Sequence, residues 1–203
     1  MLNQQTLETI ERIVTDAEGR SACELVVTLA RRSDDYTYIL LFYAAITAML
    51  APLAVLPFLS HPVAGQLIVL AEWLLFLILA LLFQTPALRK RLVPRKIRLH
   101  QAARLARQHF VARGMNGAKA PGAILLFVAF EERYVEILTN AKVPIPDERW
   151  RKIVDRLLSK IREGRLEEGL VEAVETIAET MAEACPSDDK EGTNRYPNAL
   201  TLI

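Results

Sequence analysis

Hydrophobic and polar positions divide the chain into two soluble-type segments and one long apolar stretch. Two apolar runs, residues 38–59 and 63–83, are separated only by residues 60–62. Each run holds about 21 residues and would be about 31 Å long as a helix, close to the thickness of a bilayer core. The first run has no formally charged residue, and the second has only Glu72. The pattern predicts a transmembrane helical hairpin over residues 36–83.

The soluble-type segments show the shorter periodicities of a globular domain. Before the hairpin, residues 6–18 repeat apolar positions at helical spacing, and residues 23–30 form a short run rich in β-branched residues, typical of a buried strand. The polar joint at residues 31–36 then leads directly into the first apolar run. We therefore expect the soluble domain to lie close to the bilayer surface.

The segment after the hairpin predicts a helix, two strands and two more helices. Residues 99–110 place apolar side chains on one helical face. Residues 123–129 are apolar without interruption, as in a strand covered on both faces, and residues 134–139 follow as a hairpin partner. Residues 150–161 and 166–181 again repeat apolar positions at helical spacing.

Taken in order, these elements predict an α/β fold. It is an α/β/α sandwich with a small mixed sheet, interrupted by a two-helix transmembrane hairpin, and its first two strands are expected to be parallel. Residues 1–35 and 84–186 form one discontinuous cytoplasmic domain in this interpretation. Residues 36–83 form the hairpin, and residues 187–203 form an irregular tail.

Charge sets the expected orientation in the membrane. Arg31 and Arg32 precede the first run, whereas the turn between the runs has neither Lys nor Arg. Basic residues stay on the cytoplasmic side of a membrane, which predicts a two-pass protein of a bacterial inner membrane with both termini and the soluble domain in the cytoplasm. A basic cluster follows the second run, and we expect it to lie against anionic lipid headgroups: Arg89, Lys90, Arg91, Arg95, Lys96 and Arg98.

Composition and cysteine spacing argue against a nucleic-acid-binding protein and against a cysteine metal site. The net charge of +1 argues against bulk electrostatic binding to nucleic acid. Cys23 and Cys185 are far apart in the sequence and do not have metal-ligand spacing. We therefore expect two unlinked thiols in a reducing compartment.

Motif searches give little catalytic signal. The chain has no phosphate-binding Gly-x-x-x-x-Gly-Lys loop, Gly-x-Ser-x-Gly elbow, His-Glu-x-x-His or Cys-x-x-Cys motif. His100 and His109 would lie on opposite sides of one helix and could not hold one ion together. Asp34 and Asp35 follow the first strand, where they could meet a cation or a metal-bound phosphate. They could equally be polar joint residues at the membrane surface.

Glu72 is the most informative ionisable residue. A charged carboxylate near the middle of a membrane helix costs about 2.5–3.5 kcal/mol on insertion scales. Glu72 should therefore face protein, be protonated, or both. Thr47 lies near its level on an antiparallel hairpin and is a candidate partner. The carboxylate would stabilise the hairpin by a hydrogen bond, or it would contact another membrane protein or a second copy of the chain.

Short motifs in both soluble segments follow the order of a known family. Residues 21–27 are similar to its Ser-Gly-Glu opening of the first strand, and residues 122–128 with 132–137 to its strand pair. Residues 161–164 resemble part of its helical half, and residues 194–198 its closing Asn-Glu-Leu-Pro-Asn. On these residues the soluble segments, read without the hairpin, resemble the TPM domain family.

The resemblance implies an α/β/α sandwich that is often attached to a membrane. It also implies varied functions: repair and assembly of photosynthetic complexes, receptor modulation, and acid phosphatase activity in the plant branch. Two places differ from the family pattern. Residues 119–122 replace an Arg-Thr-Gly region, and Asn140 with Lys142 stands where the family often has Asp. An amide binds a hard cation less well than a carboxylate, and a nearby ammonium group opposes cation binding.

Two functional hypotheses follow. The first is a non-enzymatic, membrane-anchored interaction or assembly module that maintains membrane protein complexes. It has no predicted cofactor, no nucleic-acid partner, and another membrane protein or a second copy as its partner. The alternative is a metal-assisted phosphatase that uses Asp34, Asp35 and Asn140 with Ca²⁺ or Mg²⁺.

Overall fold

The computed structural model describes residues 3–55, 57, 65–118, 120, 122–186 and 201–202. Its contacts divide the chain into two compact units. The first unit combines Met1–Ser33 with Leu99–Ile203, and the second is Asp34–Arg98.

The first unit is built on a mixed sheet with the strand order β3-β2-β1-β4. β1 (Glu24–Ala30) and β2 (Ala123–Ala129) are parallel, in register from Glu24 opposite Ala123 to Ala30 opposite Ala129. β3 (Tyr134–Thr139) is antiparallel to β2 and lies at one edge. The expected parallel pair and hairpin partner are confirmed.

The other edge strand comes from the stretch that the sequence suggested to be irregular. β4 (Thr201–Leu202) pairs in parallel with Thr28 and Leu29 of β1. Its two residues are too few for a periodic pattern, so only the pairing in three dimensions identifies them as a strand.

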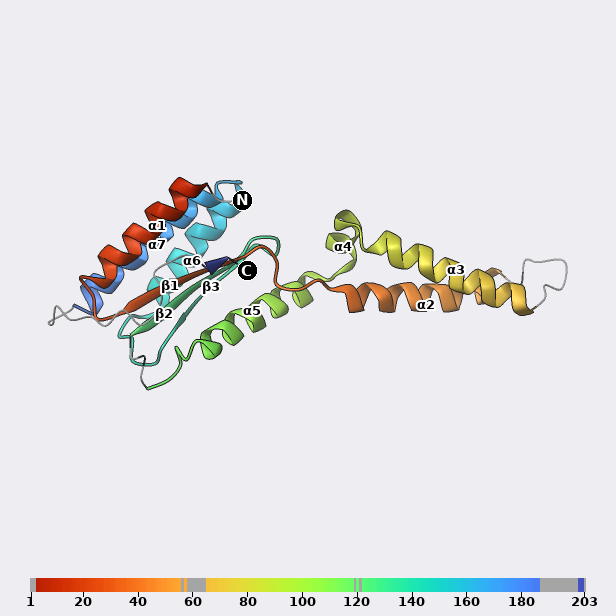
Figure 1. The fold of residues 1–203 in the computed structure, drawn as a ribbon, viewed down its shortest axis with the longest axis horizontal. Coiled ribbons are helices and arrows are strands. Elements are labelled where there is room, and N and C mark those ends of the chain that lie inside the picture. The colour runs from red at the N-terminus through yellow and green to blue at the C-terminus, as the bar shows by residue number, and fades with distance from the viewer. Residues whose placement is uncertain are drawn as a thin grey trace. The chain divides into compact units, whose positions relative to one another are not determined.

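Helices cover both faces of this sheet (Figure 1). α1 (Gln4–Glu18), α6 (Asp147–Arg162) and α7 (Leu166–Ala184) share one core with alternate residues of β1, such as Leu25 and Val27. α5 (Arg95–Ala112) packs with the intervening residues, such as Val26, on the other face. All seven residues of β2 are buried, as its unbroken apolar run predicts. The α/β/α sandwich with a small mixed sheet is therefore confirmed.

The second unit contains the two apolar helices. α2 (Thr37–Val55) and α3 (Gly65–Phe83) pack against each other as a hairpin, with the small side chains of Ala44, Ala48 and Ala80 buried. α2 continues through Pro52 and ends at Val55. The predicted turn at residues 60–62 lies outside the described residues. A short helix, α4 (Pro86–Leu92), precedes α5.

Both helices have the length and composition of membrane spans. Each has 19 residues, and their mean hydropathies are 2.1 and 2.5. Large apolar side chains remain exposed along them, including Leu53 at 72% and Trp73 at 68%. An apolar surface of this extent is unfavourable in water, whereas a bilayer would cover it. The unit therefore has two candidate membrane-spanning helices.

The cysteines are the clearest departure from expectation. Cys23 and Cys185 form a disulfide across 162 residues of sequence, with their Cα atoms 6.0 Å apart. The prediction of two unlinked thiols is wrong because α7 ends beside the start of β1. The Ala22 N–H donates to the Cys185 carbonyl there at 2.8 Å, and Ser21 pairs with Pro186 in a β-bridge.

Candidate functional site

The residues proposed from sequence lie in both units. Glu72, Asp34, Asp35 and the basic cluster belong to the second unit, and Asn140 belongs to the first. The hydrogen bonds and exposure of each group show which side chains stabilise the fold and which could contact a partner.

The basic cluster lies on α4 and the start of α5, which also contribute to a small apolar core of the second unit. Tyr36, Ile39 and Leu40 at the start of α2 pack with Val93, which joins α4 to α5. This core fixes α4 and the first turn of α5 beside the base of the hairpin. Its surface therefore carries cationic side chains from two short helical segments.

The members of the basic cluster differ in exposure. Arg91, Arg95 and Lys96 are exposed, whereas Arg89 and Arg98 are half-buried. The Arg89 Nη2 donates to the Gln84 carbonyl at 3.0 Å. The Nε atoms of Arg89 and Arg98 are buried, and neither has a hydrogen-bond partner among the residues that the structure describes. Of Lys90 only the backbone is described. A guanidinium N–H of this kind is a donor for a phosphate oxygen.

Asp34 has a structural role at the start of α2. Its Oδ1 accepts a hydrogen bond from the Tyr36 N–H at 3.2 Å. Tyr36 is 3% exposed and has a φ of 54°, a left-handed conformation that is uncommon for an aromatic residue. The Tyr36 carbonyl accepts from the N–H groups of Ile39 and Leu40, and so begins the helix. Asp34 thus stabilises a strained turn, while the neighbouring Asp35 is exposed.

Asn140 fastens a loop to the end of β3. It is 7% exposed, and its Nδ2 donates to the carbonyls of Met115 at 2.8 Å and Gly117 at 3.1 Å. Its Oδ1 accepts from the Lys142 N–H at 3.2 Å. Both amide donors are therefore used inside the protein. Among the described residues, no group of three or more His, Cys, Asp or Glu side chains could hold a metal ion.

Glu72 lies on the side of α3 that packs toward α2. The side chains of α3 that are at least partly covered recur at helical spacing: Ile68, Glu72, Leu75, Phe76, Leu79, Ala80 and Phe83. The expected bond to Thr47 is not formed, because the Thr47 hydroxyl donates to the Tyr43 carbonyl at 2.8 Å. Within the described ranges, the Glu72 carboxylate has no hydrogen-bond or ion-pair partner.

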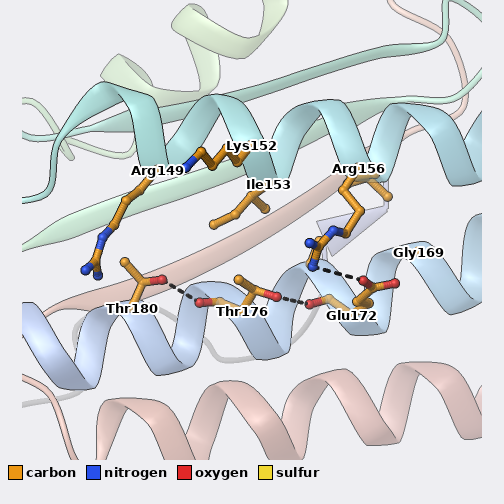
Figure 2. A pocket seen from close by; sticks show the side chains of 10 residues that line it. Arg149, Lys152, Ile153, Arg156, Gly169, Glu172, Thr176 and Thr180 are labelled. Carbon is orange, nitrogen blue, oxygen red and sulfur yellow. Dashed lines mark hydrogen bonds and ion pairs between the residues drawn. The ribbon is translucent and has the colours of Figure 1, made fainter.

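A groove between α6 and α7 was missed by sequence reasoning. It encloses about 300 Å³, and Ile153, Leu157 and Ala173 are among its buried lining residues. Arg149, Lys152 and Arg156 come from α6, with Glu172, Thr176 and Thr180 from α7 (Figure 2). The sequence signal for this groove was the spacing of the three positive residues of α6 at i, i+3 and i+7, next to an apolar helical stripe.

The charges around this groove are largely paired. Arg149 contacts Glu183 at 2.9 Å, and Arg156 contacts Glu172 at 3.3 Å. The hydroxyls of Thr176 and Thr180 donate to main-chain carbonyls of the preceding helical turn, which leaves their oxygens as acceptors. The groove therefore has an apolar floor, and two of its three cationic side chains, Arg149 and Arg156, are ion-paired.

A second polar cluster lies over the opposite face of the sheet. The Tyr134 hydroxyl donates to Glu136 at 2.9 Å, and Arg107 lies 3.9 Å from the same carboxylate. Burial, followed by the bond to Glu136, raises the pKa of Tyr134. The phenol therefore stays protonated at neutral pH and acts here as a hydrogen-bond donor. Burial, followed by the positive charge of Arg113, lowers the pKa of His109.

Comparisons with known proteins agree with this architecture. Residues 94–180, from α5 to α7, match the family model described as the TPM domain. The comparison with curated proteins gives no match. The fold is similar to the NMR structure of the BA42 protein from the psychrophilic bacterium Bizionia argentinensis, with a TM-score of 0.58 and 14% sequence identity. The alignment covers 100% of this chain and 96% of that chain, and it establishes likeness of fold.

Proposed function

From the match of residues 94–180 to the TPM domain model, we propose that this chain is a non-enzymatic, membrane-anchored module that binds other membrane proteins and helps to assemble or maintain their complexes. The observation that carries this proposal is Glu72. Its carboxylate lies within an apolar helix, is half-buried, and has no partner among the described residues. A charged group in this position costs about 2.5–3.5 kcal/mol unless another polar group meets it.

The proposed partner is another membrane protein or a second copy of this chain. Either partner could present a hydrogen-bond donor to Glu72 from one of the partner's membrane helices, because polar side chains join membrane helices in this way. The exposed apolar residues on both sides of Glu72, such as Ala71 and Trp73, would then lie against lipid or against the same partner.

We place the soluble unit on the cytoplasmic side of a bacterial inner membrane. The support is the distribution of charge, since Arg31, Arg32 and the basic cluster flank the membrane ends of the hairpin, whereas residues 60–62 have neither Lys nor Arg. Anionic headgroups would then meet the exposed Arg91, Arg95 and Lys96. Each basic residue near such a surface contributes about 1 kcal/mol of attraction.

The competing hypothesis is a metal-assisted phosphatase. The contacts of Asn140 weigh against it, because the amide already binds two carbonyls and Lys142 lies beside it. Asp34 is likewise occupied with the turn before α2. The family relationship is the reason to test this activity directly.

Site-specific photo-crosslinking in cells tests the proposal. A photoreactive residue at Ala71 should give discrete protein adducts in the Glu72 chain, and the adducts should be lost or strongly reduced in Glu72→Leu. Glu72→Gln retains hydrogen-bonding capacity and should keep most of them. The same residue at Val111, exposed in the first unit, serves as a control for non-specific capture.

Adducts that are identical in Glu72→Leu would overturn the role of Glu72. Phosphatase activity of the purified chain with Mg²⁺ or Ca²⁺ would overturn the non-enzymatic assignment if Asp34→Asn abolished it. Asp34→Asn suits this test because it keeps an oxygen for the Tyr36 N–H and removes only the charge.

A further inference from the structure

The turn between β2 and β3, residues 130–133, carries an exposed aromatic side chain. Phe130 is 45% exposed. Within the described part of the first unit, the other Phe, Tyr and Trp side chains are buried or partly buried: Phe110, Phe127, Tyr134 and Trp150. Arg133 has a φ of 51°, and its N–H donates to the Phe130 carbonyl at 3.2 Å, which closes the turn tightly. Phe130 therefore presents apolar surface that the fold of this unit leaves uncovered.

Hydrogen bonds join this turn to the residues that follow β1. The N–H groups of residues 130 and 131 donate to the carbonyls of residues 30 and 31, at 3.0 and 3.1 Å. The Glu132 carboxylate is 7% exposed, and its Oε1 accepts from the Ser33 N–H at 3.0 Å and from the Ser33 hydroxyl at 2.9 Å. The turn and the end of the first segment of this unit are therefore held together.

The covalent chain limits how far this turn can lie from the start of α2. Ser33 is four residues before Thr37, the first residue of α2. An extended chain covers at most about 3.6 Å per residue, or about 14 Å over this stretch. α2 is one of the two candidate membrane-spanning helices. With α2 in a bilayer, residues 130–133 are within reach of the membrane interface, where aromatic side chains are favoured.

The charges around Phe130 also suit a membrane surface. The Glu131 carboxylate lies 3.6 Å from the Arg31 Nε, and the Glu132 carboxylate is buried. Asp35 is the exposed acid of the joint that follows. Against it stand three exposed cationic side chains: Arg31, Arg32 and Arg133. The exposed charge near Phe130 is therefore mainly positive, which favours contact with anionic headgroups.

We propose that the β2–β3 turn is a second membrane contact of this protein, with Phe130 inserted between lipid headgroups and Arg31, Arg32 and Arg133 against anionic phosphates. An apolar side chain flanked by cations is the pattern of segments that lie in the membrane interface. The proposal rests on the membrane anchoring proposed above. It does not depend on the side of the membrane or on the partner of Glu72. The contact fixes one end of the sheet at the bilayer surface.

Tryptophan fluorescence of the full chain in nanodiscs that contain anionic lipid tests the contact, with brominated phospholipid as the quencher. Trp73→Phe removes the native tryptophan of α3 and leaves Trp150, 6% exposed, as a constant background. In that chain, Phe130→Trp should add blue-shifted emission that bromine on the upper part of the acyl chain quenches. A photoreactive residue in place of Phe130 gives a second readout, and phospholipid adducts should appear by mass spectrometry.

Val111 is the matched control position. It is 56% exposed and lies in the last turn of α5. The loop that follows is bonded through the Met115 carbonyl to Asn140, and the Asn140 N–H donates to the carbonyl of Ala123, the first residue of β2. A strand of seven residues is about 20 Å long, so positions 111 and 130 report on opposite ends of the sheet. Val111→Trp should add emission that brominated lipid does not quench.

The role of the arginines is tested by the lipid. Replacing anionic by zwitterionic phospholipid should reduce the quenching and the lipid adducts at position 130, because the attraction to the three cations is lost. Signals that are equal in the two lipids would remove the arginines from the contact.

Three results would overturn the contact itself. They are equal quenching in the Phe130→Trp and Val111→Trp chains, equal lipid adducts at the two positions, and a blue shift at position 130 with neither quenching nor adducts. The last result would mean that protein covers Phe130.

The native Trp73, 68% exposed on α3, separates these results from a failure of the anchor. Quenching of Trp73 without quenching in the Phe130→Trp chain leaves the hairpin in the membrane and removes only the turn contact. Absence of quenching at both positions removes the membrane anchoring as well.

Discussion

Strand β2 and helix α3 have similar amino-acid content and opposite exposure. β2 buries all seven of its residues, including Leu125 and Leu126. α3 buries only Ala80 among its 19 residues and leaves Leu74 at 59% exposed. The run length separates the two cases, because seven residues cannot cross a bilayer core whereas 19 in a helix can.

The difference shows that an apolar run predicts an apolar environment for its side chains. It does not show whether protein or lipid provides that environment. In the first unit other parts of the protein supply that environment through two cores, one on each face of the sheet. Removing a leucine side chain from water in this way contributes about 1.5–3 kcal/mol. In the second unit lipid would supply it, and the helices need to contact each other along one side only.

Charge on the exposed face of α3 should affect the second unit more than any other substitution considered. Leu74→Arg with Leu77→Arg should weaken insertion by about 5–7 kcal/mol, since each arginine costs about 2.5–3.5 kcal/mol near the centre of a membrane helix. Alkaline extraction of membranes should then release the protein. Val111→Arg is the matched control, because Val111 is also exposed but belongs to the water-facing unit. Release of that variant, or retention of the double variant, would contradict the assignment.

Two glycines, one in each unit, differ in how closely their helices pack against neighbouring side chains. A Cβ on Gly169 in α7 would lie 2.6 Å from the Lys160 Cβ and 3.1 Å from the Leu157 Cδ1, whereas a Cβ on Gly65 in α3 would meet nothing within 4 Å. Gly169→Ala should therefore destabilise the first unit by about 1–3 kcal/mol through overpacking.

Gly65→Ala is expected to be neutral, or to stabilise its helix by up to about 1 kcal/mol. Urea unfolding followed by limited proteolysis of the membrane-embedded chain would measure both variants under one condition. Equal unfolding midpoints for the two alanine variants would show that α6 and α7 separate at little cost.

The smallest effect concerns pH and is confined to the water-facing unit. His109 has a folded-state pKa below its ordinary value of 6.5, so the unfolded chain binds the proton more readily. Stability is then complete above about pH 6.5 and falls as the pH decreases toward the lowered folded-state value. His109→Gln should reduce this slope, and urea titrations at pH 5 and pH 8 would measure it. An unchanged slope would show that other groups cause the pH dependence.

Local signals in the sequence were enough for most of the fold. The lengths of the two apolar runs predicted α2 and α3, and the unbroken run at residues 123–129 predicted a doubly covered strand. The helical spacing of Trp150, Ile153 and Leu157 likewise predicted the buried side of α6. Each of these features depends on neighbours within a few residues, so one sequence displays it.

The details of the candidate sites depend on distant parts of the chain. Asn140 binds carbonyls of residues 115 and 117, and Cys185 reaches Cys23 across most of the protein. The groove between α6 and α7 depends on how two separately predictable helices cross. No spacing along the chain encodes such contacts. Considered alone, Asn140 suggested a possible cation ligand, and the cysteines suggested unlinked thiols.

The hairpin also affects the order in which the protein can fold. β1 and β2 are parallel neighbours, although about 90 residues separate them along the chain. Insertion of α2 and α3 as a hairpin would return both of its ends to one membrane face and leave only about half of that length as free chain. Halving a loop lowers its closure cost by about 0.6 kcal/mol. Insertion before sheet formation would therefore be the easier order of events, and a membrane around α2 and α3 would help to pair two strands of the other unit.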